Sequence, residues 1–275
     1  MMDRLHVRAA VGFAGAAAIS LAARRVRALS PSGAFTATAV GATVVAGTGV
    51  RGGGMLLAFF CSSTLLGRLP AGDHLEQRRG RERDAVQVMA NGGVAAALAL
   101  ASSLTREPTR SLLIAGFGGA VASATADTWA TEIGSRSCTR PRSILTLRPT
   151  PRGASGSVTI AGLTASAVGA ALIAWIASVR GASSALNPSP HAAAIALGGF
   201  TGALVDSVLG ATVQEVRYCD SCVVETEERL HRCGARTRVI RGSDWCSNDT
   251  VNAIATAAGA TTAILAQLPS SIRGQ

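Results

Sequence analysis

Two aspartates lie inside long apolar stretches of the chain, where an unpaired charge is costly. Asp127 belongs to GFGGAVASATADTWATEIG (116–134) and Asp206 to GGFTGALVDSVLGATVQE (198–215). An ionised side chain at the centre of a bilayer costs about 2.5–3.5 kcal/mol on insertion scales, so an intramembrane acid usually marks a functional site. We expect both acids to bind one divalent cation. The alternative is that Asp127 pairs with a loop arginine and fixes helix packing.

Mg²⁺ suits this arrangement, because it takes one or two carboxylates and leaves its other positions to water and phosphates. Glu132 and Asp249 are candidates for a third acid. On an ideal helix Glu132 points about 140° away from Asp127, so the two bind one ion only if the helix unwinds. N-capping is the alternative role for polar residues at a helix start. Amide side chains near the starts of apolar segments are candidates for binding the ion's water shell or a phosphate: Asn91, Asn248 and Asn252.

A Gly/Ser-rich turn is a candidate phosphate site. In TLRPTPRGASGSVTIAG (146–162) the turn leads directly into an apolar segment. The start of a helix presents free N–H groups and the positive end of its dipole to an anion, and arginines beside it add charge-assisted contacts. An ordinary helix cap with topogenic arginines is the alternative. The residues predicted to hold a triphosphate are Arg148, Arg152, Gly153, Ser155, Gly156 and Ser157.

Three thiols and one imidazole fall within the last long polar segment, residues 214–249. Their pattern is Cys219-x2-Cys222-x8-His231-x-Cys233. Cytoplasmic thiols stay reduced, and four sulfur and nitrogen ligands suit a tetrahedral structural Zn²⁺. The segment is therefore a candidate zinc-binding insert, in which Cys246 is an alternative fourth ligand. Unliganded loop cysteines are the other interpretation.

The segments that carry these residues have the composition of membrane helices. Of the 275 residues 48% are apolar and only 15% are charged, whereas about a quarter is charged in soluble domains. We predict an all-α integral membrane protein forming a single domain (1–275), with seven or eight transmembrane helices and three long cytoplasmic loops. The expected spans are 9–23, 33–50, 52–67, 85–104, 111–133, 156–179, 191–213 and 250–268.

The distribution of arginine predicts the orientation. The net charge of +10 comes entirely from arginine, because the chain contains no lysine. Nineteen of the 26 arginines follow the first, third, fifth and seventh expected spans. Positively charged loops stay in the cytoplasm, so we expect the long loops and the polar residues above to face the cytoplasmic side of the cell membrane. This topology explains the basic charge without a nucleic-acid partner.

Five segments also occur, in the same order, in a known family of polytopic membrane proteins. The chain resembles the domain of unknown function 92 family, which includes the transmembrane protein 19 group of animals and the phytyl-phosphate kinase of tocopherol synthesis in chloroplasts. The resemblance runs from about Pro31 to Ala260. The five segments are RERDAVQVMANGGVAA, ATADTWATEIG, PRSILTLRPTPRGASGSVT, GGFTGALVDSVLGATVQE and NDTVN.

The resemblance implies transfer of a phosphoryl group from a nucleoside triphosphate, CTP in the plant enzyme, to a prenyl monophosphate in the membrane. On this hypothesis Asp127 and Asp206 bind Mg²⁺ while the 153–157 turn holds the triphosphate. The family turn usually has Gly-Thr-Asn/Asp-Gly-Gly-Val, whereas this chain has Gly153-Ala-Ser-Gly-Ser-Val158. The departure falls on the segment expected to bind nucleotide.

Two other functions are compatible with the pattern. An ion-coupled transporter is the second hypothesis, since intramembrane acids such as Asp127 and Asp206 and internal repeats are typical of carriers. A membrane scaffold whose zinc loop binds partners is the third. The acids are expected near one face of the membrane rather than at its midplane, which favours the kinase.

Overall fold

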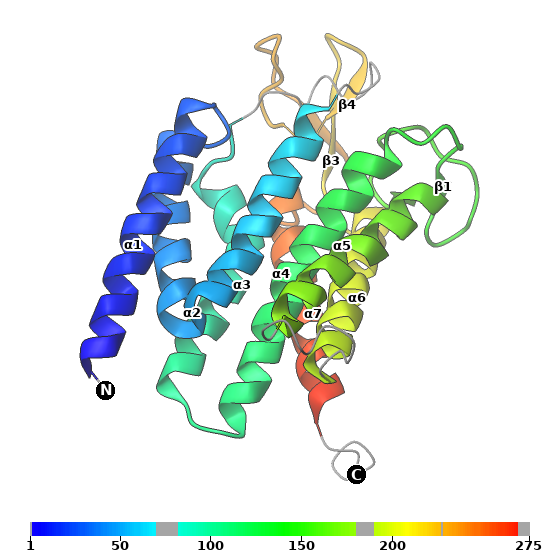
Figure 1. Ribbon diagram of the computed structural model, residues 1–275. Helices are drawn as coiled ribbons and strands as arrows, with labels where there is room; N and C mark the ends of the chain where they lie inside the picture. Colours follow the sequence, from blue (N-terminus) through cyan, green and yellow to red (C-terminus); the bar gives the residue numbers. More distant parts are fainter. Residues whose placement is uncertain (1, 70–81, 180–189, 227, 269–275) are drawn as a thin grey trace.

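The computed structural model describes residues 2–69, 82–179, 190–226 and 228–268, which form a helix bundle with two small sheets (Figure 1). Parts of two expected loops, 70–81 and 180–189, lie outside the described residues. The described residues form seven helices: α1 (Met2–Arg25), α2 (Pro31–Arg68), α3 (Ala85–Leu104), α4 (Thr109–Gly134), α5 (Ile160–Ser178), α6 (Pro190–Thr212) and α7 (Asn248–Gln267).

The prediction of an all-α protein was wrong in the loops. Strands β1 (Arg142–Ser143) and β2 (Ser157–Val158) form an antiparallel pair. Strands β3 (Val216–Cys219), β4 (Val224–Thr226) and β5 (Arg238–Arg241) form a second sheet in the order β4-β3-β5. The second sheet lies in the segment expected to be a loop, where the β-branched and aromatic residues of VRYC, VET and RVIR favour strands.

Helix α2 reverses direction at Gly49, whose backbone is not helical (φ 74°, ψ −169°). Glycine adopts positive φ without steric cost, which permits the reversal. Phe60 packs in one apolar cluster with Ala34, although a straight helix would separate these residues by about 39 Å. The expected spans 33–50 and 52–67 are therefore the two arms of one element.

Four of the described helices are long and apolar enough to cross a membrane. Helices α1, α4 and α7 are not among these four. The protein is thus mostly helical, and the seven or eight crossings stay a prediction. The helices that qualify are Pro31–Arg68, Ala85–Leu104, Ile160–Ser178 and His191–Thr212.

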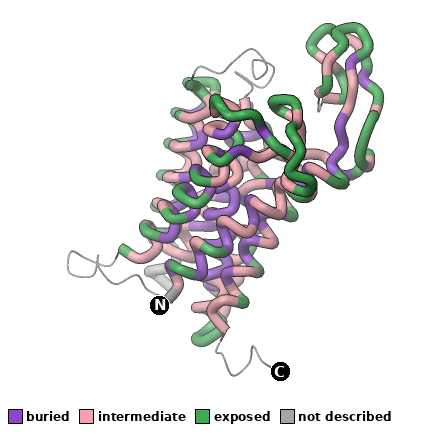
Figure 2. Tube along the Cα trace, turned by 90° about the vertical axis from the view of Figure 1, so that its right-hand side faces the viewer, coloured by how far each residue is buried: buried purple, intermediate pink, exposed green. Residues whose placement is uncertain are grey.

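Helix α4 is the centre of the bundle. Its residues 115–126 are all buried, and it packs against α2, α3, α5, α6 and α7. Figure 2 shows that buried residues concentrate in the interior of the bundle, whereas the small segments projecting from one end are largely exposed. A helix that is buried on all sides needs no polar face, which explains the run of small apolar residues before Asp127.

Three glycines let α4, α6 and α7 cross at close range. A Cβ atom on Gly119 would lie 2.5 Å from the Gly259 carbonyl oxygen, and one on Gly198 would lie 2.4 Å from the same atom. A Cβ on Gly259 would lie 2.9 Å from the carbonyl oxygens of both partners. Small residues at such crossings let helix backbones approach in membrane proteins. The Gly-Gly pairs before the two aspartates are therefore packing positions.

The polar connections lie at one end of the bundle. Figure 1 shows the end of α1, the β1 hairpin and strands β3 and β4 at the end opposite the start of α1 and the end of α7. This is the end that carries most of the described arginines. Its cytoplasmic location stays a prediction from the arginine distribution.

Candidate functional site

Asp127 and Asp206 lie at matching positions on two helices in close contact. Ala126 of α4, Ala170 of α5 and Ala203 of α6 pack together as one buried cluster. Asp127 follows one residue after this contact, and Asp206 follows three residues after it, both toward the polar end of the bundle. Because one helical turn is 3.6 residues, both acids lie within about one turn, or 5 Å along the axis, of a shared contact.

Helix α7 brings further polar groups to the same level. It runs antiparallel to α4 and α6, and its crossing residue is Gly259. Asn252 precedes Gly259 by seven residues, which is about 10 Å along the helix. Asp127 and Asp206 each follow their crossing glycine by eight residues, or about 12 Å in the same direction. Three helices thus present polar side chains to one layer.

The start of α7 excludes the capping alternative for Asn248 and Asp249. The N-cap is Ser247, whose hydroxyl accepts a hydrogen bond from the Thr250 backbone N–H at 3.3 Å. Asn248 and Asp249 are therefore the first two helical residues. The Asn248 side-chain oxygen accepts a hydrogen bond from Gln214 Nε2 at 3.4 Å, which connects α7 with the end of α6.

An open cleft of about 1570 Å³ collects these groups. It is lined at the polar end by residues from α2, α3, α4, α5, α6 and α7 and by the 151–157 loop. Of the predicted site residues outside the zinc cluster, Arg148 alone is not part of its wall. Those that line it are Asn91, Asp127, Glu132, Arg152, Gly153, Ser155, Gly156, Ser157, Asp206, Asn248, Asp249 and Asn252.

Glu132 is engaged in an ion pair. Arg136 Nη1 lies 2.8 Å from Glu132 Oε2, and Arg136 Nη2 donates to the carbonyl oxygens of Leu66 and Leu69 at 3.0 and 2.9 Å. The pair joins the end of α4 to the end of α2. An acid that is already paired with an arginine is less suited to be the third cation ligand.

The expectation that the Gly/Ser turn opens a helix was wrong. Ser157 and Val158 form β2, and α5 begins at Ile160. The N-cap is Thr159, whose hydroxyl accepts from the Gly162 N–H at 3.0 Å. Gly156 has a φ of +77°, and a Cβ there would lie 2.3 Å from the Ala211 nitrogen. Gly156 therefore seats the loop on α6, and the helix dipole is not directed through this turn.

The two predicted phosphate-binding arginines have different surroundings. Arg152 donates to the Ser137 and Cys138 carbonyl oxygens at 2.6 and 3.4 Å, which holds the loop against the end of α4. Arg148 is exposed and lies outside the cleft wall. That Arg148 holds phosphate therefore stays a prediction, without support from the cleft wall.

Arg83 is a further arginine of the cleft, which the sequence indicated only as part of a positively charged loop. Arg83 lines the cleft and lies 6.0 Å from the centre of the Phe60 ring. Burial lowers the pKa of the Arg83 guanidinium, and the Glu132 carboxylate opposes that shift. A guanidinium stays protonated in proteins, so Arg83 is a partly desolvated cation near the acids. In the sequence, Arg83 could have been noticed because it directly precedes Asp84, the residue that caps α3.

Two serines were also missed. Ser166 of α5 and Ser63 of α2 line the cleft and are 2% and 1% exposed. Their hydroxyl oxygens have no hydrogen-bond partner among the described residues. A buried hydroxyl without a partner costs about 1–3 kcal/mol. Ser166 precedes Ala170 by one turn, so it lies at the level of the aspartates and is suited to bond a polar ligand or water.

The cysteine and histidine side chains of the insert come together. The ligand atoms of Cys219, Cys222, His231 and Cys233 all lie within 4.8 Å of one another. Cys219 Sγ lies 3.6 Å from Cys233 Sγ, and His231 Nδ1 lies 3.2 Å from the latter. Ligands about 2.3 Å from a tetrahedral Zn²⁺ lie about 3.8 Å apart. The cluster has the composition and spacing to bind a metal such as zinc.

The cluster also favours deprotonation of one thiol. The hydrogen bond from His231 lowers the pKa of Cys233 to about 6, whereas the hydrogen bond with Cys233 is the main cause that raises the pKa of Cys222 to about 11. Metals bind thiolates rather than thiols. A preformed thiolate at Cys233 therefore suits the binding of a cation.

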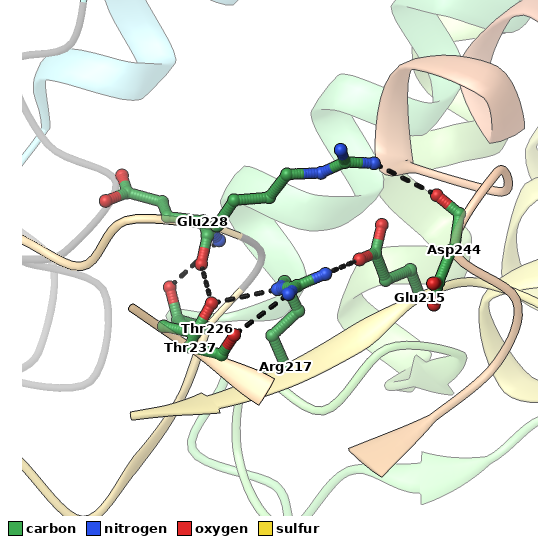
Figure 3. A network of polar contacts seen from close by, with 7 residues as sticks. Glu215, Arg217, Thr226, Glu228, Thr237 and Asp244 are labelled. Carbon is green, nitrogen blue, oxygen red and sulfur yellow. Dashed lines mark hydrogen bonds and ion pairs between the residues drawn. The ribbon is translucent and has the colours of Figure 1, made fainter. Parts of the chain in front are cut away.

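A polar network fixes the insert on the bundle (Figure 3). Arg217 bonds the Thr237 side chain and carbonyl at 2.8 and 2.9 Å and pairs with buried Glu215. Arg241 donates to the Gly210 carbonyl at 2.9 Å. Because Glu215 and Gly210 belong to the end of α6 and its connection, the sheet is held close to the cleft. His231 is a member of both the metal cluster and the cleft wall.

Comparison with known proteins supports the resemblance drawn from the motifs. Protein PGR of Arabidopsis thaliana is 31% identical over 226 residues, which cover 74% of this chain and 77% of that protein. An uncharacterized membrane protein of Synechocystis is 29% identical, covering 68% of this chain and 72% of its own. An uncharacterized membrane protein of Methanocaldococcus jannaschii is 26% identical, over 70% of this chain and 78% of that protein. No solved structure matches.

The profile of one family covers most of the chain. It is described as integral membrane protein DUF92 and matches residues 14–260, which include every element from α2 to the first half of α7. The cleft-lining acids and the metal cluster all fall inside the matched range. The chain therefore belongs to the DUF92 family of integral membrane proteins.

Proposed function

We propose that the protein is a prenyl-phosphate kinase of the cell membrane. It transfers the terminal phosphoryl group of a nucleoside triphosphate such as CTP to an isoprenoid monophosphate, at the cytoplasmic face. The bond from the terminal phosphorus to the bridging oxygen breaks, and a new bond to an acceptor phosphate oxygen forms. The products are a nucleoside diphosphate and a prenyl diphosphate.

The observation that carries the proposal is the shared layer of Asp127 and Asp206. Carboxylates from α4 and α6 lie within one turn of a three-helix contact, and Asp249 and Asn252 reach the same cleft from α7. Oxygen ligands of this kind suit Mg²⁺, which leaves positions for water and phosphate oxygens. Bound there, Mg²⁺ would neutralise charge on the transferred group. Ser166 adds a hydroxyl that lacks a partner among the described residues.

Cationic side chains supply the second requirement of phosphoryl transfer. Arg83, Arg229 and Arg232 line the same cleft as the acids. Phosphoryl transfer needs in-line positioning and neutralisation of phosphate charge rather than covalent chemistry by the protein. The acceptor is already an anion, so no dedicated base is required. The arginines are suited to bind the phosphate groups of the two substrates.

The zinc cluster has a structural part in this proposal. A closed Cys₃His set leaves a tetrahedral ion no open position for substrate. We assign Zn²⁺ to Cys219, Cys222, His231 and Cys233 as the element that orders the loop carrying Arg229 and Arg232. In this role Zn²⁺ affects substrate binding by ordering the loop, and it does not contact the reacting groups.

Label transfer from γ-labelled CTP to phytyl or geranylgeranyl monophosphate tests the function. Purified protein in detergent should form labelled prenyl diphosphate, and Asp127→Asn and Asp206→Asn should each reduce the rate by at least about 100-fold, as expected when a metal ligand at a transition-state charge is lost. Leu65→Phe, on the exposed side of α2, is the control for handling and folding.

Two results would overturn the kinase. Normal transfer by either aspartate variant removes that residue from the mechanism. Solute or proton flux into liposomes that depends on Asp127 and Asp206, with no label transfer, would favour the ion-coupled carrier instead.

A further inference from the structure

The cleft continues past the acids as an apolar trough. Its wall there is formed by residues of α1 and of both arms of α2, as far as Val50 next to the reversal at Gly49. The trough has polar groups at one end and apolar side chains along its length. The residues that line this part include Val11, Gly15, Ile19, Val45, Gly54 and Leu57.

The polar end of the cleft and the trough together are longer than one leaflet of a bilayer. The second arm of α2 lines the cleft from Gly67, beside Glu132, to Gly54. These thirteen residues of helix measure about 20 Å. The hydrocarbon region of one leaflet is about 15 Å thick, half of the usual 30 Å. A ligand that reaches from the polar end to Gly54 is therefore long, and the part of it in the trough is apolar.

Glycines along α1 and α2 have two different functions. Gly12 and Gly41 let the helices touch, because a Cβ on either would lie within 2.9 Å of a side-chain atom across the interface. Gly15 and Gly54 have no atom within 4 Å of an added Cβ. These last two positions keep space open where a side chain would fill it.

Positive charge surrounds the polar end of the trough. Arg27, Arg68 and Arg83 line the cleft there. Arg68 Nη2 donates to the Val26 carbonyl at 2.6 Å, which places it across the gap between α1 and the end of α2. An anionic head group at this position lies between arginines and the acid layer, while its chain lies along the apolar walls.

We propose that the trough binds the single hydrocarbon chain of a lipid phosphate, and that Gly54 with Gly15 determines the longest chain accepted. The identity of the head group rests on the proposed kinase function. The chain site rests on the continuity of the trough with the cleft, its length and its open glycine positions. Both glycines lie within helices, so a larger residue is compatible with their backbone.

Binding without nucleotide tests this proposal separately from catalysis. The dissociation constants of farnesyl and geranylgeranyl monophosphate are measured for detergent-solubilised protein by native mass spectrometry. For Gly54→Leu we expect geranylgeranyl monophosphate to bind about tenfold or more weakly, because the end of its chain loses buried apolar surface. Farnesyl monophosphate should bind within about twofold of wild type. Gly15→Leu should show the same selectivity from the opposite wall.

The controls separate a filled trough from a damaged fold. Gly54→Ala adds one methyl group and should retain most of the affinity for the longer chain, and Leu65→Phe adds bulk on the same arm outside the cleft wall. Equal weakening of both lipids, or no change for either, would overturn the chain site. Length-selective binding without label transfer would keep the chain site and remove the kinase.

Discussion

Asp127 and Asp206 are equivalent residues of two parallel helices. Each follows a glycine pair of which one member packs against Gly259, and each lies eight residues beyond that glycine. An acid in this environment is costly unless a cation or hydrogen bonds stabilise it. The side chains of the layer thus form the part of the molecule most directly tied to function.

The acids of the cleft should divide into two classes on substitution. Glu132→Gln removes a half-buried ion pair with Arg136, so we expect a loss of about 1 kcal/mol in unfolding free energy and a transfer rate near that of wild type. Asp249→Asn should leave stability nearly unchanged and reduce transfer at least about tenfold. Thermal unfolding and label transfer on the two variants measure both effects. A rate lost only in Glu132→Gln would reverse the assignment.

At the scale of elements, the loop before α5 is a packing device. Gly153 and Gly156 both have positive φ, but only Gly156 lies against another helix. Comparing the two glycines separates backbone strain from packing. The comparison also tests whether the loop supports the cleft by contacting α6 rather than by presenting a helix dipole.

Gly153→Ala and Gly156→Ala form a matched pair. Gly153→Ala adds only the strain of a positive φ, about 1 kcal/mol. Gly156→Ala adds the same strain and drives a Cβ into the Ala211 backbone, so we expect a loss of about 3 kcal/mol or more. Chemical or thermal unfolding in one detergent measures both. Equal losses would contradict the packing role of Gly156.

The insert should depend on its metal while the bundle does not. Wild-type protein should contain about one zinc per chain, and Cys219→Ser together with Cys222→Ser should contain none. Structural zinc sites contribute folding free energy directly, so chelation should increase hydrogen exchange in residues 216–241 and leave α4 protected. Elemental analysis and hydrogen exchange measure the two outcomes. A metal-free wild type with a fully protected insert would contradict the zinc site.

At the scale of the whole molecule, helical segments and acids were predictable and their contacts were not. Apolar runs indicated the helices, and Asp127, Asp206 and the arginine-rich loops indicated one polar end. Arg148 lies in the loop between strands β1 and β2. Its position could not be predicted, because strands of two residues leave no recognisable pattern in a sequence. The burial of Ser166 depends on packing between distant helices, and no local pattern encodes it.

The apolar trough was equally hidden in the sequence. Gly12, Gly15, Gly41 and Gly54 are alike as residues, yet two of them pack helices and two leave space open. Only the reversal at Gly49, which folds the two arms of α2 beside α1, separates these roles. Sequence alone gives the composition of such a wall, and the fold decides which positions face the ligand.

The central claim is that Asp127 and Asp206 share one divalent cation, and Mn²⁺ binding followed by electron paramagnetic resonance tests it most directly. Purified wild-type protein should bind one Mn²⁺ that Mg²⁺ displaces. Asp127→Asn and Asp206→Asn should each abolish that binding, while Glu132→Gln retains it. Unchanged Mn²⁺ binding in either aspartate variant would show that the two carboxylates do not hold a common ion.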